Sequence, residues 1–158
     1  MPRMYSVSFT QQTIANASGD YDLWELTPAD DKPIEIVGLV LAVTSELGDA
    51  AEEILPIQII RGHTTSGSGG GTPTPGPLDP IDTAAGFTVE DRNTTIASAG
   101  TTVTLHADAF NVRAGYQIWF PDGCGPRASQ ANTTLVVRSS ATVADDVTMS
   151  GTLYVREG

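Results

Sequence analysis

Apolar residues along this chain alternate with polar ones or form short β-branched blocks, which clusters of glycine, proline, asparagine and aspartate separate. A period of two places apolar side chains on one face of a β-strand, and the 3.6-residue period of a helix is scarce here. The pattern therefore predicts an all-β protein. The expected strands are Tyr5–Ile14, Tyr21–Leu26, Pro33–Thr44, Ile54–Arg61, Phe87–Asp91, Thr102–His106, Phe110–Phe120, Thr133–Arg138 and Val147–Glu157.

The residue patterns of two of these strands predict where each strand lies within its sheet. The stretch Pro33–Thr44 begins with alternation and becomes apolar on both faces, which predicts a strand that passes from an edge into a covered interior. Pro56 has no backbone N–H, so its strand is expected at a sheet edge or a bulge. Nine or ten strands in one unit fit a two-sheet sandwich of jelly-roll type. An up-and-down barrel is the alternative, although irregular strand spacing disfavours it.

Residues 62–85 differ from the rest, because ten of these 24 residues are glycine or proline. Loops of this length inside a compact domain are usually functional or are linkers. A linker would leave two halves of four or five strands, each marginally stable alone. We therefore expect a single β-sandwich domain over 1–158, with 62–85 as an extended loop or arm within it. The glycines predict a flexible hinge and Thr72–Pro80 a stiff arm, with a surface loop of no role as the alternative.

Charge limits the classes of partner. The chain has 158 residues, with 19 acidic and 8 basic side chains and a formal net charge of -11. This charge repels phosphate and anionic lipid, so we expect no binding to nucleic acid or to a membrane. No apolar run of signal-peptide length precedes Gln11, and the longest apolar stretch, Ile36–Val43, is too short to span a bilayer. Cytoplasmic synthesis is the default, with the lone Cys124 as a turn residue.

No catalytic constellation is recognisable in the sequence. His63 and His106 each stand alone, without the spacing that zinc sites use. Ser66 and Ser68 lie between glycines but lack a nucleophile elbow, and the glycine-rich run 67–71 lacks the ending of a phosphate loop. We therefore expect no enzymatic activity, no catalytic residues, no cofactor and no metal site.

Acidic side chains gather at Glu46–Glu53 and again at Asp145 and Asp146. Carboxylate oxygens are the ligands that calcium prefers, but neither group has the twelve-residue register of a calcium loop. A solvated acidic loop is the favoured interpretation, and cation binding at Glu46–Glu53 stays open.

The two tryptophans allow opposite interpretations. Buried tryptophans in a β-sandwich belong to the core, whereas exposed ones stack on ligands or partner chains. In the strand around Trp119, the residues Tyr116, Ile118 and Phe120 share one face, and Gln117 and Trp119 share the other. One aromatic set must lie on the less buried side, which suggests contact with another chain.

Four segments resemble small proteins encoded among the head genes of tailed bacteriophages and prophages. They are Leu26–Pro33 (LTPADDKP), Ile60–Gly70 (IRGHTTSGSGG), Thr72–Phe87 and Phe110–Gly115 (FNVRAG). The similarity extends over nearly the whole chain, and the run in Ile60–Gly70 is its most specific part. It is a mark of the family, since it contains no recognisable chemical motif.

The resemblance implies a structural virion protein of the capsid decoration, or cement, family. Such proteins form β-rich trimers on the outer capsid surface, where they bind the major capsid protein and stabilise the mature head. The implied location is the capsid exterior, after synthesis in the cytoplasm of the host bacterium. The expected interface residues are Met4, Tyr5, Trp24, Thr72, Pro73, Pro75, Pro77, Leu78, Ile81 and Trp119.

The main alternative is a receptor- or glycan-binding module of a phage tail fibre or tail tip. Trp24 or Trp119 would then be the platform on which a sugar ring stacks. An enzyme such as a capsule depolymerase is disfavoured, because the sequence has no paired carboxylates and no internal repeats.

Overall fold

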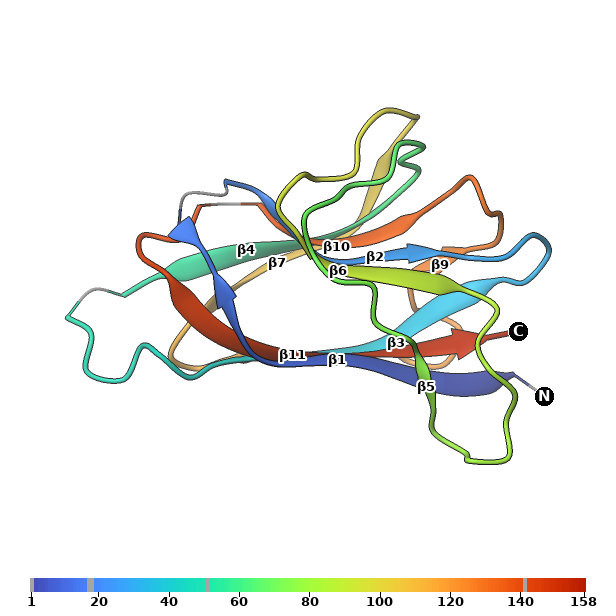
Figure 1. Ribbon diagram of the computed structural model, residues 1–158, viewed down its shortest axis with the longest axis horizontal. Helices are drawn as coiled ribbons and strands as arrows, with labels where there is room; N and C mark the ends of the chain where they lie inside the picture. The colour runs from blue at the N-terminus through green and yellow to red at the C-terminus, as the bar shows by residue number, and fades with distance from the viewer. Residues whose placement is uncertain (1, 17–18, 51, 141) are drawn as a thin grey trace.

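The computed structural model describes residues 2–16, 19–50, 52–140 and 142–158, and it is all-β. Two antiparallel sheets pack face to face as a sandwich (Figure 1), as the sequence predicted. None of the described residues belongs to a helix long and apolar enough to cross a membrane. The strands are β1 (Arg3–Ile14), β2 (Tyr21–Thr27), β3 (Ile34–Val43), β4 (Ile54–Arg61), β5 (Gly76–Pro77), β6 (Thr88–Asn93), β7 (Val103–Asn111), β8 (Tyr116–Trp119), β9 (Arg127–Ala128), β10 (Leu135–Ser139) and β11 (Val147–Glu157).

The strand order is that of a jelly roll. The first sheet runs β5-β1-β11-β3-β8, with β9 also paired to β3, and the second sheet runs β6-β2-β10-β4-β7. Eight of the strands form nested antiparallel pairs: β1 with β11, β2 with β10, β3 with β8 and β4 with β7. The chain is thus a rolled-up hairpin whose tip lies between β4 and β7. The glycine- and proline-rich residues 62–85 fall at this tip.

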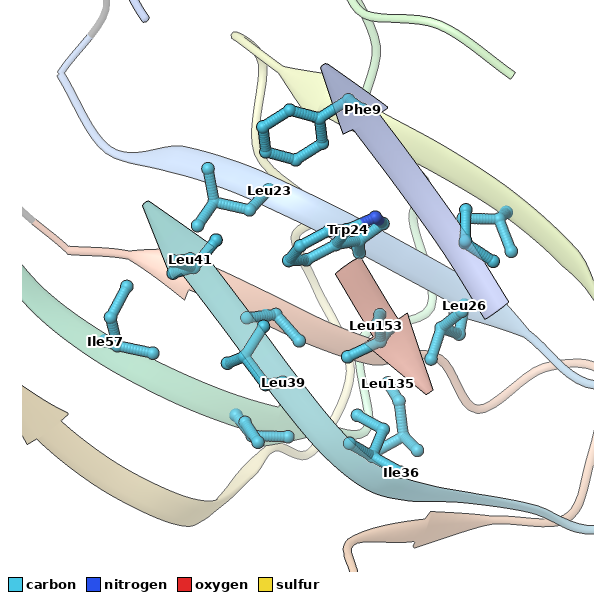
Figure 2. Close-up of a cluster of buried hydrophobic side chains, with 14 of the residues drawn as sticks. Phe9, Leu23, Trp24, Leu26, Ile36, Leu39, Leu41, Ile57, Leu135 and Leu153 are labelled. Atoms are coloured by element: carbon cyan, nitrogen blue, oxygen red, sulfur yellow. The ribbon is translucent and has the colours of Figure 1, made fainter. Parts of the chain in front are cut away.

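The core lies between the two sheets. Figure 2 shows side chains from both sheets meeting there, among them Leu23, Leu39 and Leu153. Trp24 is completely buried and packs against Phe9, with ring centroids 5.0 Å apart. Room for the indole comes from Gly151, where a Cβ atom would lie 2.7 Å from Trp24. The glycine that interrupts the apolar alternation of β11 is therefore part of the packing of Trp24.

Three expectations about strands are corrected. The predicted strand Phe110–Phe120 is divided between the end of β7 and β8, with a turn at 112–115. The predicted strand Thr102–His106 continues to Asn111. Pro56 is not on an edge strand, since β4 lies between β10 and β7. Pairing of β4 with β10 begins only at Ile57, so the missing N–H of Pro56 falls outside that ladder.

Residues 62–85 lie against the sandwich, whereas the sequence predicted a flexible hinge and a free arm. Thr65, Ser68 and Gly71 form bridges with Ser98, Thr95 and Asp91, so the segment runs antiparallel to β6 and to the chain that follows it. The two loops rise together above the second sheet in Figure 1. Further along, β5 pairs with β1 and extends the first sheet.

The glycines of this segment permit close approach between backbones. A Cβ atom on Gly70 would lie 1.8 Å from the carbonyl oxygen of Asp91, and one on Gly67 would lie 2.3 Å from that of Thr95. Gly62 has φ of +112°, which glycine adopts without strain. The glycine-rich run therefore serves tight packing between two backbone segments. In the sequence alone, a run selected for tight packing looks the same as one selected for flexibility.

A layer of buried polar side chains lies beneath these loops. Arg138 of β10 donates from Nε to Asp22 Oδ1 at 2.6 Å and from Nη2 to the carbonyl of Ala97 at 3.0 Å. The amide of Ala97 in turn donates to Asp22 Oδ2 at 2.7 Å. His63 Nε2 lies 3.5 Å from Arg138 Nη2, and His63 Nδ1 lies 3.3 Å from the carbonyl oxygen of Ala99. This network attaches both loops to the outer face of the second sheet.

Candidate protein interface

One side of the sandwich presents two open sheet edges. Strand β7 ends the second sheet and β8 ends the first, and within the described residues each pairs with a single long strand, β4 or β3. The turn at 112–115 joins them, and Phe110 of β7 lies 5.6 Å from Tyr116 of β8 between ring centroids. The outer backbone N–H and C=O groups of both strands are therefore available to another chain.

Strand β7 lacks the features that usually protect an edge strand. Native proteins guard such edges with lysine, proline or inward-pointing charges, because an open edge templates pairing with another chain. None of the nine residues of β7 is a proline, lysine or arginine, and Asp108 is the single acidic one. Val103, Leu105, Ala107 and Ala109 are exposed. These properties are typical of a strand that another protein covers.

A polar contact links the two edge strands. His106 Nε2 lies 2.8 Å from the hydroxyl of Tyr116, which donates to Asp108 Oδ2 at 3.2 Å. Burial, together with the charge of Asp108, raises the pKa of the Tyr116 hydroxyl well above its usual value. The hydroxyl therefore stays protonated, and the trio positions β7 against β8. His106 is thus a hydrogen-bonded strand residue.

Trp119 adds an exposed aromatic surface to this side. Its side chain is 50% exposed on the outer face of the first sheet. The ring lies over Gly38 of β3, where a Cβ atom would approach within 2.3 Å, and its centroid is 5.0 Å from that of Tyr154. Contact with Gly38 and Tyr154 leaves the ring in one orientation, which reduces the entropy that binding a partner would cost.

A second exposed apolar group lies at the opposite edge of the first sheet. Leu78 and Ile81 follow β5 and are 52% and 87% exposed. The amide of Leu78 donates to the carbonyl of Met4 at 2.9 Å, so the start of this loop is attached to β1. Four strand spacings, or roughly 19 Å, separate β5 from β8. The predicted interface residues therefore form two distant groups.

Three of the predicted interface residues are buried within the chain, and for these the prediction is corrected. Tyr5 and Trp24 are completely buried, and Pro75 is buried as well. Tyr5 packs edge-on against Phe87 and donates its hydroxyl to the carbonyl of Thr83 at 3.0 Å. Of the others, Thr72 and Pro77 are exposed, and Met4 and Pro73 are partly buried. The exposed residues Val103 and Leu105 of β7 were not among the interface residues expected from the sequence. The signal that could have identified them is a strand without lysine or proline to protect its edge.

The acidic residues of two separate loops converge. Glu46, Asp49 and Asp145 place one carboxylate oxygen each within 4.8 Å of the others. Ser45 donates to Glu46 and works to lower its pKa, but burial and the neighbouring acids outweigh this and raise it. Such oxygens suit a hard divalent cation. Acidic clusters are common on protein surfaces, however, so this one by itself assigns no site.

Glu25 of β2 is buried beneath the loops that cover the second sheet, and its carboxyl group has a shifted pKa. Burial raises the pKa of its carboxyl above the ordinary value of 4.5, although the amide of Gly67, donating at 2.9 Å, opposes the change. A raised pKa means that the folded chain binds the proton of Glu25 more tightly than the unfolded chain does.

We expect the Glu25→Gln variant to gain stability relative to the wild type as the pH rises. Ionisation of Glu25 costs stability as the pH rises from 4.5 through the raised value, and glutamine removes this cost. Urea unfolding of both proteins between about pH 4 and pH 8 measures the difference. A difference that stays constant over this range would contradict the assignment, and Glu52→Gln, at an exposed acid, is the control.

No family model matches this chain, and no curated protein matches it. Chains from particles of infectious bursal disease virus are similar among solved structures. The T=1 particle chain is 15% identical over 98% of this chain and 40% of its own, with a TM-score of 0.26. The VP2 subviral particle chain has the same identity and TM-score over 41% of its own length. This chain spans about 40% of the solved chains it matches, and TM-scores this low assign neither family nor function.

Proposed function

We propose that this chain is a structural protein of a virus particle, a decoration protein that binds the outside of the capsid as a homotrimer. It would contact the major capsid protein and stabilise the mature head. The observation that carries the trimer is the pair of exposed apolar groups at opposite edges of one sheet, at β8 and beside β5. The sequence resemblance to phage head proteins supports the capsid as the location.

Two different patches on opposite sides suit a closed ring. In a heterologous interface, one patch of each copy contacts the other patch of the next copy, and the chain of contacts closes when the rotation permits. The β7–β8 edge would receive the loop that holds Leu78 and Ile81 in the neighbouring copy. The net charge of -11 opposes self-association, but β7 has only one acidic residue. Contact along β7 therefore brings few like charges together.

Binding to a composite site explains how such a trimer would stabilise a head. A ligand that binds the mature lattice and not its open forms lowers the free energy of the mature lattice by mass action. The acidic charge suits the outer surface, because a chain with this charge does not compete for the packaged genome.

We expect the wild type to sediment as a trimer and two single variants to sediment as monomers. Ala107→Lys introduces a charge on the β7 edge, and Ile81→Asp introduces one in the opposite patch. Each is expected to weaken assembly by at least about tenfold, as loss of an interface anchor does. Ala42→Lys, at an exposed alanine on the outer face of β3, is the control and keeps the trimer.

Mixing the two variants tests the heterologous arrangement. Ala107→Lys retains the patch at Ile81, and Ile81→Asp retains the β7 edge, so one intact interface forms between them and a heterodimer results. Failure of the mixture to associate would contradict this arrangement. Electron cryomicroscopy of particles is expected to place three copies at each threefold position, and finding the chain only in the tail would refute the decoration role.

A glycan-binding module of a tail fibre or tail tip remains the second candidate, favoured by one observation. Trp119 is a half-exposed ring over Gly38, a surface on which a sugar can stack. Trp24 is excluded as a platform because it is completely buried. Saccharide binding that Trp119→Ala abolishes without unfolding the chain would favour this candidate, and an absence of binding across a glycan array would count against it.

A further inference from the structure

A groove of about 470 Å³ lies between residues 72–75 and the edge of the second sheet. Glu25 of β2 and Glu90 of β6 both line it, and these two residues are direct cross-strand partners. Thr27 and Thr72 contribute hydroxyl groups, and Pro73 contributes apolar surface. The groove therefore combines two carboxyl groups with a lining suited to an aliphatic side chain that ends in a charged group.

Glu25, which lines this groove, has one carboxyl oxygen without a hydrogen-bond partner among the described residues. Its side chain is 2% exposed, and Oε2 accepts hydrogen bonds from the amide of Gly67 at 2.9 Å and from Asn93 Nδ2 at 3.4 Å. Oε1 has no hydrogen-bond partner among the described residues. Buried acceptors in native proteins are almost always paired, because an unpaired one costs free energy. A donor that reaches this oxygen from the groove would supply the hydrogen bond that it lacks.

Glu90 brings a second carboxylate to the same place. Ser66 Oγ donates to Glu90 Oε2 at 2.7 Å, and Asn93 Nδ2 donates to the same oxygen at 3.3 Å. Asn93 thus lies between the two carboxyl groups. The charge of Glu90 also contributes to the raised pKa of Glu25, after the larger effect of burial. A cation in the groove would relieve this repulsion.

We infer that this groove binds the guanidinium group of an arginine side chain from another protein. A guanidinium has five N–H donors in a planar fork, so it can donate to two carboxyl groups at once. It is also less strongly hydrated than an ammonium group, which suits a largely buried carboxylate. The prolines at 73 and 75 would pack against the aliphatic stem.

The arginine comes from a protein of different sequence. All seven arginines of this chain already make hydrogen bonds or ion pairs within it, so a second copy would have to break one of these to fill the groove. They are Arg3, Arg61, Arg92, Arg113, Arg127, Arg138 and Arg156. The inference does not rest on the proposed function, because the isolated chain suffices to test it.

The test is titration of the full chain with the blocked peptide acetyl-Gly-Arg-Gly-amide at low salt, followed by NMR. We expect saturable shifts at the Gly67 amide and the Asn93 side-chain amide, with a dissociation constant of about 1 mM. The citrulline peptide, which has the same shape without the charge, is expected to bind at least about tenfold more weakly. The lysine peptide is also expected to bind more weakly, since its ammonium cannot span both carboxyl groups as a planar fork.

Variants locate the site. Glu25→Gln and Glu90→Gln are each expected to weaken the arginine peptide by about tenfold, whereas Glu52→Gln removes the same charge at an exposed loop and leaves binding unchanged. Absence of saturable shifts, or equal binding of the citrulline peptide, would overturn the inference. Equal binding of the lysine peptide would refute guanidinium recognition, and full binding by Glu25→Gln would refute the role of Glu25. Because Glu90 is only partly buried, its variant tests the site even if Glu25→Gln fails to fold.

Discussion

Replacing Arg138 by methionine is expected to lower the free energy of unfolding by about 3–5 kcal/mol, the usual cost of breaking a buried ion pair. Arg138 donates to both oxygens of Asp22, at 2.6 and 3.3 Å, and Asp22 is completely buried. Methionine fills much of the same space but leaves the carboxylate without its counter-charge. The contact to Ala97, which attaches the loop 94–101, is lost as well. Urea unfolding followed by tryptophan fluorescence measures the change.

Two further variants of this chain distinguish the loss of the ion pair from the loss of packing. In the double variant Asp22→Asn with Arg138→Met, no uncompensated charge remains, so part of the stability is expected to return. Arg3→Met removes an exposed arginine 3.6 Å from Asp82 and is expected to change stability by less than about 1 kcal/mol. A loss below about 1 kcal/mol in Arg138→Met itself would show that the network contributes little.

Gly70→Ala is expected to destabilise the fold by about 1–3 kcal/mol, as overpacking of a tight contact does. The new Cβ atom would lie 1.8 Å from the carbonyl oxygen of Asp91, so the two segments must separate. Hydrogen bonds in both directions between Gly71 and Asp91, at 3.0 and 2.9 Å, would weaken with them. Amide hydrogen exchange at these two residues is expected to accelerate together with the loss of stability.

Gly76→Ala is the matched control in the same segment. A Cβ atom there meets only the carbonyl oxygen of Ser6, at 3.9 Å, and its φ is not in the left-handed region. We expect a change within about 0.5 kcal/mol. If Gly70→Ala is equally neutral, the glycine run is a flexible hinge, as the sequence suggested, and the contacts with β6 are dispensable.

Strands with strong local patterns were predictable from the sequence. The bounds expected for Ile54–Arg61 and Val147–Glu157 are the observed bounds of β4 and β11, because alternation and β-branched residues determine such strands locally. The two-sheet sandwich followed from the number of strands. The division of Phe110–Phe120 was missed, because the turn at 112–115 is produced by pairing of β7 and β8 with different sheets.

The candidate interface was predictable only in part. Exposure of Leu78, Ile81 and Trp119 agrees with the sequence interpretation, whereas Tyr5 and Trp24 are buried. Trp24 faces the core by alternation with Leu26, and its neighbour Leu23 also faces the core because the β2–β10 pairing shifts register at Leu23. Such a bulge has no local sequence signature.

The sequence by itself determined that this chain is all-β, acidic and interrupted by a glycine- and proline-rich stretch at 62–85, because composition and side-chain period are local properties. The tertiary structure alone decided what that stretch does. Rolling the hairpin places its tip over the second sheet, where Gly70 meets Asp91 and Gly67 meets Glu25. It also leaves β7 and β8 as neighbouring open edges. Both outcomes depend on which distant segments pair, and long-range pairing is a property of the whole fold.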